Sequence, residues 1–293
     1  DLSYYPTERG PYNYNANDLF VNSQGQLKLD NATQNWGGVM RNLTTTDFEQ
    51  ANIEFIQFWL MDPFHEDSEN SVGGELYFNL GNVSEDILKD SKKFFENGLP
   101  SGPDDVSSTT ELTTWSVVPT TQVIVNAFDN TTNSNAAQDV GLDGMNNATE
   151  NALRADFLNS LSPQVLALVT ADPSNDDYRY FRGGAVDNLN IIDRYKRYNA
   201  TEGNSITTTD SQESFPTQAT TLPTTEDINQ DQNLSKAESY YQYKVNLRPN
   251  QMSIGQNYIT DMFETFATTQ EGSRPITWYQ FKIPIKDINS ANA

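Results

Sequence analysis

Short segments in which apolar and polar residues alternate lie near both ends of this 293-residue chain. The alternation is clearest in residues 75–80, 239–247 and 276–285, where apolar side chains occupy one face of an extended backbone. A period of two residues is typical of a β-strand with one buried face. Pro284 has no backbone N–H, which predicts that the last segment reaches a sheet edge or its own end there. Both ends of the chain are therefore predicted to be β-structure.

Three other segments predict two strands and a helix. Residues 53–61 are apolar on both faces of a strand, which predicts a place in the middle of a sheet. Ser84, followed by two acidic residues, is typical of a helix N-terminus, and Gly98 would end that helix. Residues 117–128 form a further strand candidate, interrupted by Pro119.

Changes in composition divide the chain into four consecutive parts. Residues 1–128 are predicted to be the β-rich part of a sandwich, and residues 129–202 an acidic helical insertion. Residues 203–226 carry many Thr and Ser but no Lys or Arg, which is typical of a linker or mobile loop. Residues 227–293 hold a calcium-like loop and the returning β-strands. The expected fold class is mainly β with an α insertion, as in a β-sandwich or jelly-roll-like domain.

The charge balance excludes several classes of partner. The chain has 18 basic and 40 acidic residues, a formal net charge of −22. This field repels the phosphates of nucleic acids and anionic lipid headgroups, whereas it attracts divalent cations. The absence of Cys excludes disulfides and thiolate metal sites. No apolar run is long enough for a membrane-spanning helix, and a start at Asp1 without Met or signal peptide predicts a piece of a longer precursor.

The strongest candidate for a binding site is a twelve-residue acidic loop, residues 227–238. Oxygen-bearing side chains stand at its alternate positions and at its last position. Calcium takes about six to eight oxygen ligands, and alternate spacing lets one short loop turn its oxygens inward around the ion. Gln232 replaces the glycine that such loops use for their sharp turn. The predicted calcium ligands are Asp227, Asn229, Asp231, Asn233 and Glu238.

A second calcium-like loop covers residues 139–150. Gly144 occupies the position of the sharp turn, Glu150 closes the loop, and a helix is predicted to follow. Gly141 is a departure, because it offers no side-chain oxygen where such loops supply a ligand. For both loops the alternative is a solvated turn stabilised by Asn and Asp side chains. A bound calcium would have a structural role. The predicted ligands of this loop are Asp139, Asp143, Asn147 and Glu150.

Nothing in the sequence indicates a catalytic centre. The single His, His65, lies in a segment typical of an exposed turn after a strand, so a Ser-His-Asp relay is not predicted. Acidic pairs such as Asp62 and Glu66 could be assigned to a glycosidase, but a chain so rich in carboxylates always offers such pairs. P-loop, dinucleotide-binding and zinc motifs are absent. We therefore expect no enzymatic activity.

Several long motifs together resemble one protein family. They span nearly the whole chain, apart from the Thr-rich stretch. The motifs are YYPTERGPYNY (4–14), NWGGVMR (35–41), FWLMDPF (58–64), GGELYFNLGN (73–82), DVGLDG (139–144), RYKRYNATEGN (194–204) and WYQFKIPI (278–285). They look like the SprA/Sov family, the outer-membrane translocon of the type 9 secretion system and of gliding motility in Bacteroidota.

The resemblance implies a very large outer-membrane β-barrel protein that passes folded cargo, of which this chain is a fragment. Such a fragment cannot close the barrel, so we expect a water-exposed domain inserted between barrel strands. The extracellular side, as in a cap over the pore, is favoured over the periplasmic side. Other parts of the translocon, its accessory proteins and secreted cargo are the expected partners. Rival functions are a carbohydrate-binding β-sandwich of a surface protein and, less favoured, a glycosidase.

Overall fold

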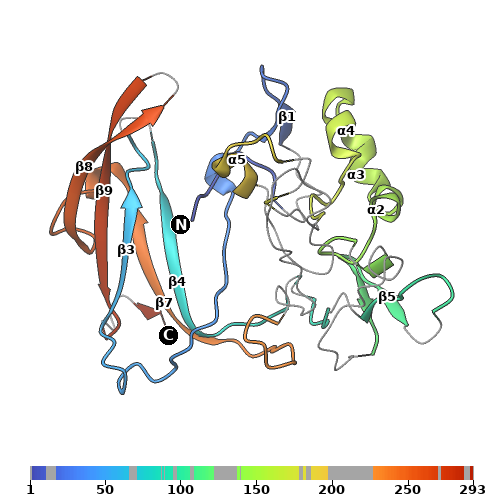
Figure 1. The fold of residues 1–293 in the computed structure, drawn as a ribbon, viewed down its shortest axis with the longest axis horizontal. Helices are drawn as coiled ribbons and strands as arrows, with labels where there is room; N and C mark the ends of the chain where they lie inside the picture. Colours follow the sequence, from blue (N-terminus) through green and yellow to red (C-terminus); the bar gives the residue numbers. More distant parts are fainter. Residues whose placement is uncertain are drawn as a thin grey trace. The chain divides into compact units, whose positions relative to one another are not determined.

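The computed structural model divides the chain into two compact units, each built from two separate stretches of sequence (Figure 1). The acidic-loop unit comprises Asp1–Asn42 and Ser84–Lys236, and the sandwich unit comprises Leu43–Val83 and Ala237–Ala293. The structure describes residues 2–10, 18–65, 71–86, 88, 90–94, 98–105, 109–121, 137–138, 140–177, 181–182, 186–196, 227–269, 272–286 and 291–292.

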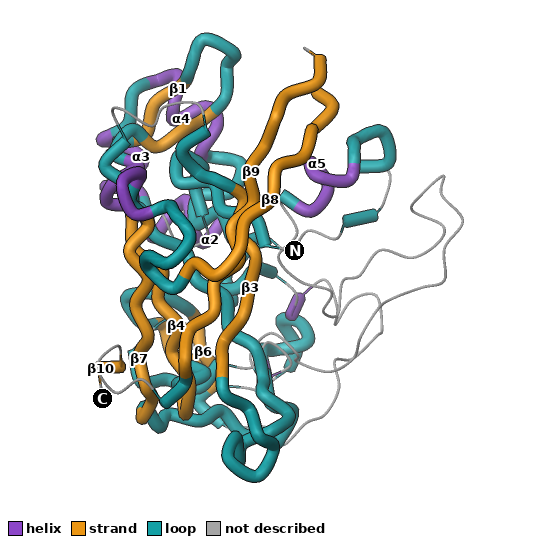
Figure 2. Tube along the Cα trace, turned by 90° about the vertical axis from the view of Figure 1, so that its left-hand side faces the viewer, coloured by secondary structure: helices purple, strands orange, loops and turns teal. Residues whose placement is uncertain are grey.

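The sandwich unit contains two antiparallel three-stranded sheets, whose strands run side by side in Figure 2. The first sheet has the order β3–β9–β8, and the second has the order β10–β7–β4. A 3₁₀ turn, η3, follows β7. The elements are β3 (Phe55–Met61), β4 (Gly74–Asn82), β7 (Ser239–Leu247), η3 (Pro249–Gln251), β8 (Ile259–Thr269), β9 (Gly272–Pro284) and β10 (Ala291–Asn292).

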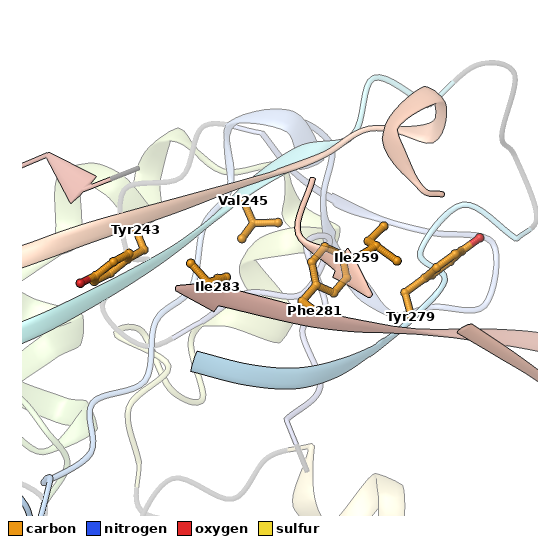
Figure 3. Close-up of a cluster of buried hydrophobic side chains, with 6 residues drawn as sticks. All are labelled: Tyr243, Val245, Ile259, Tyr279, Phe281 and Ile283. Carbon is orange, nitrogen blue, oxygen red and sulfur yellow. The ribbon is translucent and has the colours of Figure 1, made fainter. Parts of the chain in front are cut away.

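The hydrophobic core of the sandwich unit lies between its two sheets (Figure 3). Phe281 of β9 is fully buried and stacks on Phe58 of β3, with ring centroids 4.9 Å apart. Phe58 also contacts Phe78 of β4, at a centroid distance of 5.1 Å. Side chains from both sheets therefore meet in one core, as in a β-sandwich. The buried members are Tyr243, Val245, Ile259, Tyr279, Phe281 and Ile283.

The alternation seen in the sequence is confirmed by the burial of these strands. Along β9, Tyr279, Phe281 and Ile283 are buried, and the residues between them are more exposed. Pro284 is the last residue of β9, so the strand ends at this proline, as the sequence allowed. A proline at this point removes no hydrogen bond from the middle of the ladder, so β9 can be the central strand of its sheet.

The prediction that residues 53–61 lie in the middle of a sheet is wrong. β3 is the edge strand of its sheet, and only one of its faces is turned to the core. Phe55 and Trp59 point outward and are 38% and 39% exposed. Their partners are surface groups: Trp59 packs edge-on against Phe263 at 5.0 Å, and the Lys282 ammonium lies 4.0 Å from the centre of the Phe55 ring. The outward-facing apolar residues of this strand therefore make contacts along the surface, and the strand is not buried on both faces.

The acidic-loop unit combines short strands and short helices with long connections. Its described strands form two antiparallel pairs, β1–β2 and β5–β6. One core, around Leu158 and Val169, joins the helices to the β1–β2 pair, and a smaller core contains Phe94 and Val118. The elements are β1 (Leu19–Val21), β2 (Leu27–Leu29), η1 (Ala32–Gln34), β5 (Thr110–Leu112), β6 (Val117–Pro119), α2 (Asn147–Leu153), α3 (Ala155–Ser160), α4 (Pro163–Val169) and α5 (Ile191–Tyr195).

The helix predicted to begin at Ser84 is wrong where the structure describes this segment. Ser84 accepts the N–H of Asp86 at 3.1 Å, as a cap would, but turns and bends follow. The Asp86 carboxylate accepts the N–H groups of Asp90 and Ser91, and Ser91 adopts a φ of 65°. Side chains therefore take the backbone donors that a helix would have bonded internally.

The fold class is mainly β, as predicted, and the α-helices of the described residues lie in the acidic-loop unit. A jelly-roll arrangement and insertion into a large barrel stay predictions. The two units do not follow the four consecutive segments expected from the sequence, because β3 pairs with β9 and β4 with β7. Residues 203–226 lie outside the described residues. Within the described part of the chain, no helix has both the length and the apolar character needed to cross a membrane.

Candidate metal centre

Three carboxyl groups from separate parts of the acidic-loop unit meet in its interior. One oxygen atom from each of Asp143, Glu150 and Asp176 lies within 4.8 Å of the other two. All three residues are 0% exposed. Carboxylates removed from water and placed beside one another are costly unless something neutralises them. This cluster is therefore the candidate functional site of the acidic-loop unit.

The loop before α2 directs Asp143 into the interior. Gly144 supplies a φ of 70°, and a Cβ atom at this position would lie 2.5 Å from the carbonyl oxygen of Val117. Only glycine fits that turn without a clash. The carbonyl oxygen of Asp143 accepts the N–H of Val117 at 2.9 Å, which fixes the loop against β6.

Helix α2 positions Glu150. Asn146 is the N-cap, and its side chain accepts the N–H of Thr149 at 2.9 Å. Glu150 follows in the first turn, where the partial positive charge of the helix N-terminus favours a carboxylate. The cap thus sets both where the helix begins and which way Glu150 points.

The loop after α4 supplies Asp176. Its N–H donates to the Asp172 carboxylate at 3.0 Å, which closes a tight turn. Arg9 donates to the carbonyl oxygen of Asp172 at 3.0 Å and to that of Pro173, and Asn175 donates back to the carbonyl oxygen of Arg9 at 2.9 Å. The N-terminal segment therefore holds this loop in place.

Hydrogen bonds link the three carboxyl groups to one another. The N–H of Asp143 donates to Asp176 Oδ2 at 2.8 Å. Ser174 donates its hydroxyl to Asp143 Oδ2 at 2.9 Å and its N–H to Glu150 Oε2 at 3.0 Å. Asp143 Oδ1 accepts the N–H of Met145 at 2.9 Å. Each bond fixes a carboxylate in a direction, so the cluster is preorganised.

Glu150 has a carboxylate oxygen that lacks such a donor among the described residues. Glu150 Oε1 is buried and accepts no hydrogen bond from any donor in the described part of the chain. Asn147 Oδ1, one helical turn earlier on α2, is also buried and also accepts no hydrogen bond from the described residues. Buried oxygens of this kind are rare, because an unsatisfied acceptor costs about 1–3 kcal/mol.

Arginine neutralises the cluster incompletely. Arg154 is 5% exposed, and its Nη2 lies 3.6 Å from Asp143 Oδ2. The same guanidinium also donates to the carbonyl oxygens of Thr114 and Trp115, at 3.1 and 3.0 Å. Its charge is therefore held at one side of the cluster, against Asp143.

Burial raises the pKa of all three carboxyl groups. The pKa of Asp143 rises to about 6, that of Glu150 to about 7 and that of Asp176 to about 9. Repulsion from the neighbouring carboxylates adds to the effect of burial on Glu150 and Asp176. Burial also lowers the pKa of Arg9 to about 10, against the attraction of Asp172, Glu150 and Asp176. Without a further positive charge, the cluster therefore retains protons at neutral pH.

The structure brings together part of the site predicted from the sequence of residues 139–150. Asp143 and Glu150 are in the cluster, and Asn147 donates its side-chain N–H to Asp177 Oδ2 at 3.2 Å. Asp139 lies outside the described residues. Asp176 was missed by sequence reasoning. Its signal was a second Asp-rich turn, residues 172–177, directly after α4, but sequence spacing does not show which loops meet.

The other predicted loop, residues 227–238, is organised by its own backbone donors. The Asp227 carboxylate accepts the N–H groups of Asp231 at 3.1 Å and of Gln232 at 2.8 Å. Gln232 adopts a φ of 68°, so the sharp turn forms although glycine is absent. Asn233 accepts a hydrogen bond from Lys93 at 2.6 Å.

The carboxylates of this loop do not gather as those of the cluster do. Among the described residues, Asp227, Asp231 and Glu238 do not form a group of closely spaced oxygens, and Glu238 is exposed. Asn229 accepts the N–H of Asp231 at 2.8 Å, which is an Asx turn. A calcium ion at this loop stays a prediction. The Asx turn is also what the alternative predicts, a solvated turn stabilised by Asn and Asp side chains.

The buried carboxylate of Glu85 binds the backbone of this loop, although it lies far from the loop in the sequence. Glu85 is 4% exposed and accepts the N–H groups of Ile228 at 3.1 Å, Asn229 at 3.4 Å and Ser235 at 2.8 Å. A carboxylate that accepts several N–H groups can order a loop without a metal ion.

His65 lies in an exposed turn after β3, as predicted. The Asp62 side chain accepts the N–H of Phe64 at 2.9 Å in that turn. Glu66, the other half of the glycosidase pair weighed from the sequence, lies outside the described residues.

Comparison with known proteins finds a family match for part of the chain. Residues 154–292 match SprA_N, described as a motility related/secretion protein. The match includes Asp176 and the strands β7 to β9, and it begins after Glu150. No curated protein matches the chain. Residues 154–292 of the chain are thus similar to the SprA_N family of motility related/secretion proteins, and this match confirms the resemblance to the SprA/Sov family.

Proposed function

We propose that this chain is a non-catalytic structural domain of the type 9 secretion outer-membrane translocon, where it shapes or caps the protein-conducting pore. A role in motility or secretion follows from the family match itself. The match is the observation that carries the proposal. It covers α3 to α5 of the acidic-loop unit and β7 to β9 of the sandwich unit, so its implication applies to both units.

The packing of the two units supports a passive role. The core of the sandwich unit consists of apolar and tyrosine side chains between two sheets. The carboxylate cluster of the acidic-loop unit is fully buried, so a substrate would reach it only after the unit opened. Both features suit a rigid scaffold better than a reactive pocket.

The charge supports a place in water beside the pore. With a net charge of −22, the chain repels anionic lipid headgroups, so its natural surroundings are aqueous. We propose the extracellular side, with the remaining parts of the translocon, its accessory proteins and secreted cargo as partners.

Deletion of this segment from the parent gene tests the role. The expected result is retention of cargo inside the cells, with the shortened parent protein present in the outer membrane. If the segment caps the pore, the cells should also become sensitive to vancomycin, which is too large for ordinary porins. Normal secretion with normal amounts of the shortened protein and unchanged vancomycin resistance would overturn the proposal.

Point variants separate the role of the sandwich from that of the whole segment. Phe281→Asp places a charge in the core and should unfold the sandwich unit, because an isolated buried carboxylate costs several kcal/mol. Gln57→Asp introduces the same charge on the exposed face of β3 and is the matched control. Cargo secretion should fall with Phe281→Asp alone. Equal secretion by both variants, at equal abundance, would contradict a role for the sandwich unit.

The carbohydrate-binding rival is tested on the same protein. The exposed Trp59–Phe263 pair is the surface that a sugar ring would stack on. Our proposal expects no glycan on a broad array to bind the chain. Binding that is lost in Trp59→Ala would favour the rival.

A further inference from the structure

We propose that Asp143, Glu150 and Asp176 bind one calcium ion, and that this ion ties helix α2 to the loop after α4. The site differs from the loop predicted from sequence alone, because one of its three carboxylates comes from another segment. It does not depend on the proposed function, since its test measures the ion and the stability of the chain.

The unpartnered oxygen of Glu150 is the first observation that points to a ligand. Glu150 is 0% exposed, and its Oε1 accepts no hydrogen bond from any described residue, although Oε2 accepts the N–H of Ser174. Oxygen atoms of Asp143 and Asp176 lie within 4.8 Å of a Glu150 oxygen. A cation among these oxygens would give Glu150 Oε1 the partner that the protein does not provide.

The place of Asp176 is the second observation. In a calcium loop that begins at Asp139, Gly141 stands where a side-chain oxygen is expected. A Cβ atom at Gly141 would lie 3.2 Å from both carboxylate oxygens of Asp176. Asp176 therefore brings its oxygens to the space that the missing side chain leaves open. Asp143 and Glu150 stand at the fifth and twelfth positions of that loop in the sequence.

The local charge fits a divalent ion. Asp143, Glu150, Asp176 and Asp172 would carry four negative charges when ionised, and Arg9 and Arg154 supply two positive charges nearby. The difference is two negative charges in a buried region. One divalent cation balances it, whereas a monovalent ion would not.

The donor atoms select a hard cation. The three side chains offer carboxylate oxygens, the chain contains no Cys, and its single His belongs to the sandwich unit. Oxygen donors suit calcium and magnesium better than zinc. Calcium is favoured over magnesium because it accepts irregular sets of carboxylates, whereas magnesium requires a near-ideal octahedron and gives up its waters reluctantly.

The test is thermal unfolding of the 293-residue chain, after chelation and then with calcium chloride added. At a calcium concentration about 100 times the dissociation constant, the melting temperature should rise by about 5–10 °C. Asp176→Asn keeps the shape of the side chain but removes a ligand charge. It should fold in chelator at least as well as the parent chain, since it removes repulsion, and should lose most of the calcium-dependent rise.

Two control variants make the result specific. Asp156→Asn removes an exposed carboxylate of α3 in the same unit and should keep the full rise. Asp231→Asn alters the other predicted loop and should also keep it. Isothermal titration calorimetry should show that Asp176→Asn weakens calcium affinity at least about 10–100-fold, as loss of even an outer partner of a metal ligand does.

Four outcomes would overturn the proposal. The first is an unchanged melting temperature of the parent chain on calcium addition. The second is a rise that Asp176→Asn retains in full. The third is a rise that disappears in Asp231→Asn and not in Asp176→Asn, which would move the ion to residues 227–238. The fourth is an equal rise with magnesium at the same concentration, which would remove the assignment to calcium.

Discussion

The carboxylate of Asp176 lies beside the bare α-carbon of Gly141, and a Cβ atom there would come within 3.2 Å of both Asp176 oxygens. Gly141 also has a φ of 121°, which side-chain-bearing residues rarely adopt. The N–H of Asp143, two residues later, donates to the same carboxylate at 2.8 Å. Glycine at this position is thus a condition for bringing the two loops together.

Replacing Gly141 with Ala should destabilise the chain by about 1–3 kcal/mol, because the backbone is strained and Asp176 must move. The measurement is urea unfolding in chelator. Gly25→Ala is the matched control, because Gly25 also has a positive φ, 75°, but a Cβ there meets nothing within 4 Å. Equal losses for the two variants would show that the contact with Asp176 does not matter.

The metal-free chain should lose stability as pH rises. Burial, then repulsion from Asp143 and Glu150, raises the pKa of Asp176 from 3.8 to about 9. Between these values the folded state holds a proton that the unfolded chain has released, so raising the pH through this range favours unfolding. In chelator, the melting temperature should therefore be lower at pH 8 than at pH 5.

Asp176→Asn is the control for this pH dependence, because its amide cannot ionise. The variant should show a smaller fall in melting temperature between pH 5 and pH 8 than the parent chain. A parent chain whose melting temperature stays level, or rises, over this range would contradict the raised pKa values of the cluster.

Glu85→Ala should loosen residues 228–235. The change removes the acceptor of three backbone N–H groups and leaves buried donors unsatisfied, at a cost of about 1–3 kcal/mol. Hydrogen exchange of these amides should become faster. Glu111→Ala removes an exposed carboxylate that pairs with Lys92, and should change stability much less, because solvent screens the pair. Unchanged exchange in Glu85→Ala would show that the loop is held by other groups.

Phe281→Ala should cost the sandwich unit about 3–5 kcal/mol, because a fully buried ring leaves a cavity between the sheets. Phe266→Ala makes the same change on β8 at a side chain that is 72% exposed, and should cost far less. Denaturant unfolding followed by circular dichroism gives both values. Similar losses would mean that the core is not where the structure places it.

The strands were predictable because one-sided burial leaves a period of two in the sequence. Tyr279, Phe281 and Ile283 show that period and are buried. β3 was misread, since outward-facing Phe55 and Trp59 are large and apolar without being in the core. Periodicity measures hydrophobicity, and a surface ring that packs on another surface group gives the same signal as a core residue.

The candidate site was predictable only in the part that is local in sequence. Asp143 and Glu150 follow from their spacing within one twelve-residue loop around a glycine turn, which is the ligand spacing of calcium loops. Asp176 depends on how the loop after α4 folds back, which Asp172 fixes within the loop and Arg9 fixes from a distant position in the sequence. Such long-range pairings leave no periodic trace in a single sequence.

The register of β4 and β7 places the two ends of residues 84–236 next to each other in the chain's topology. Asn82, at the end of β4, is opposite Ser239, at the start of β7. The long excursion of residues 84–236 therefore leaves and re-enters the sandwich through neighbouring strand ends, and the N–H of Glu85 still reaches the carbonyl oxygen of Ser235 at 2.9 Å. Topologically the excursion is an enlarged hairpin turn on a two-stranded stem. A short turn in its place would leave every strand of the stem with the same partner, so the sandwich could be made as a protein of its own.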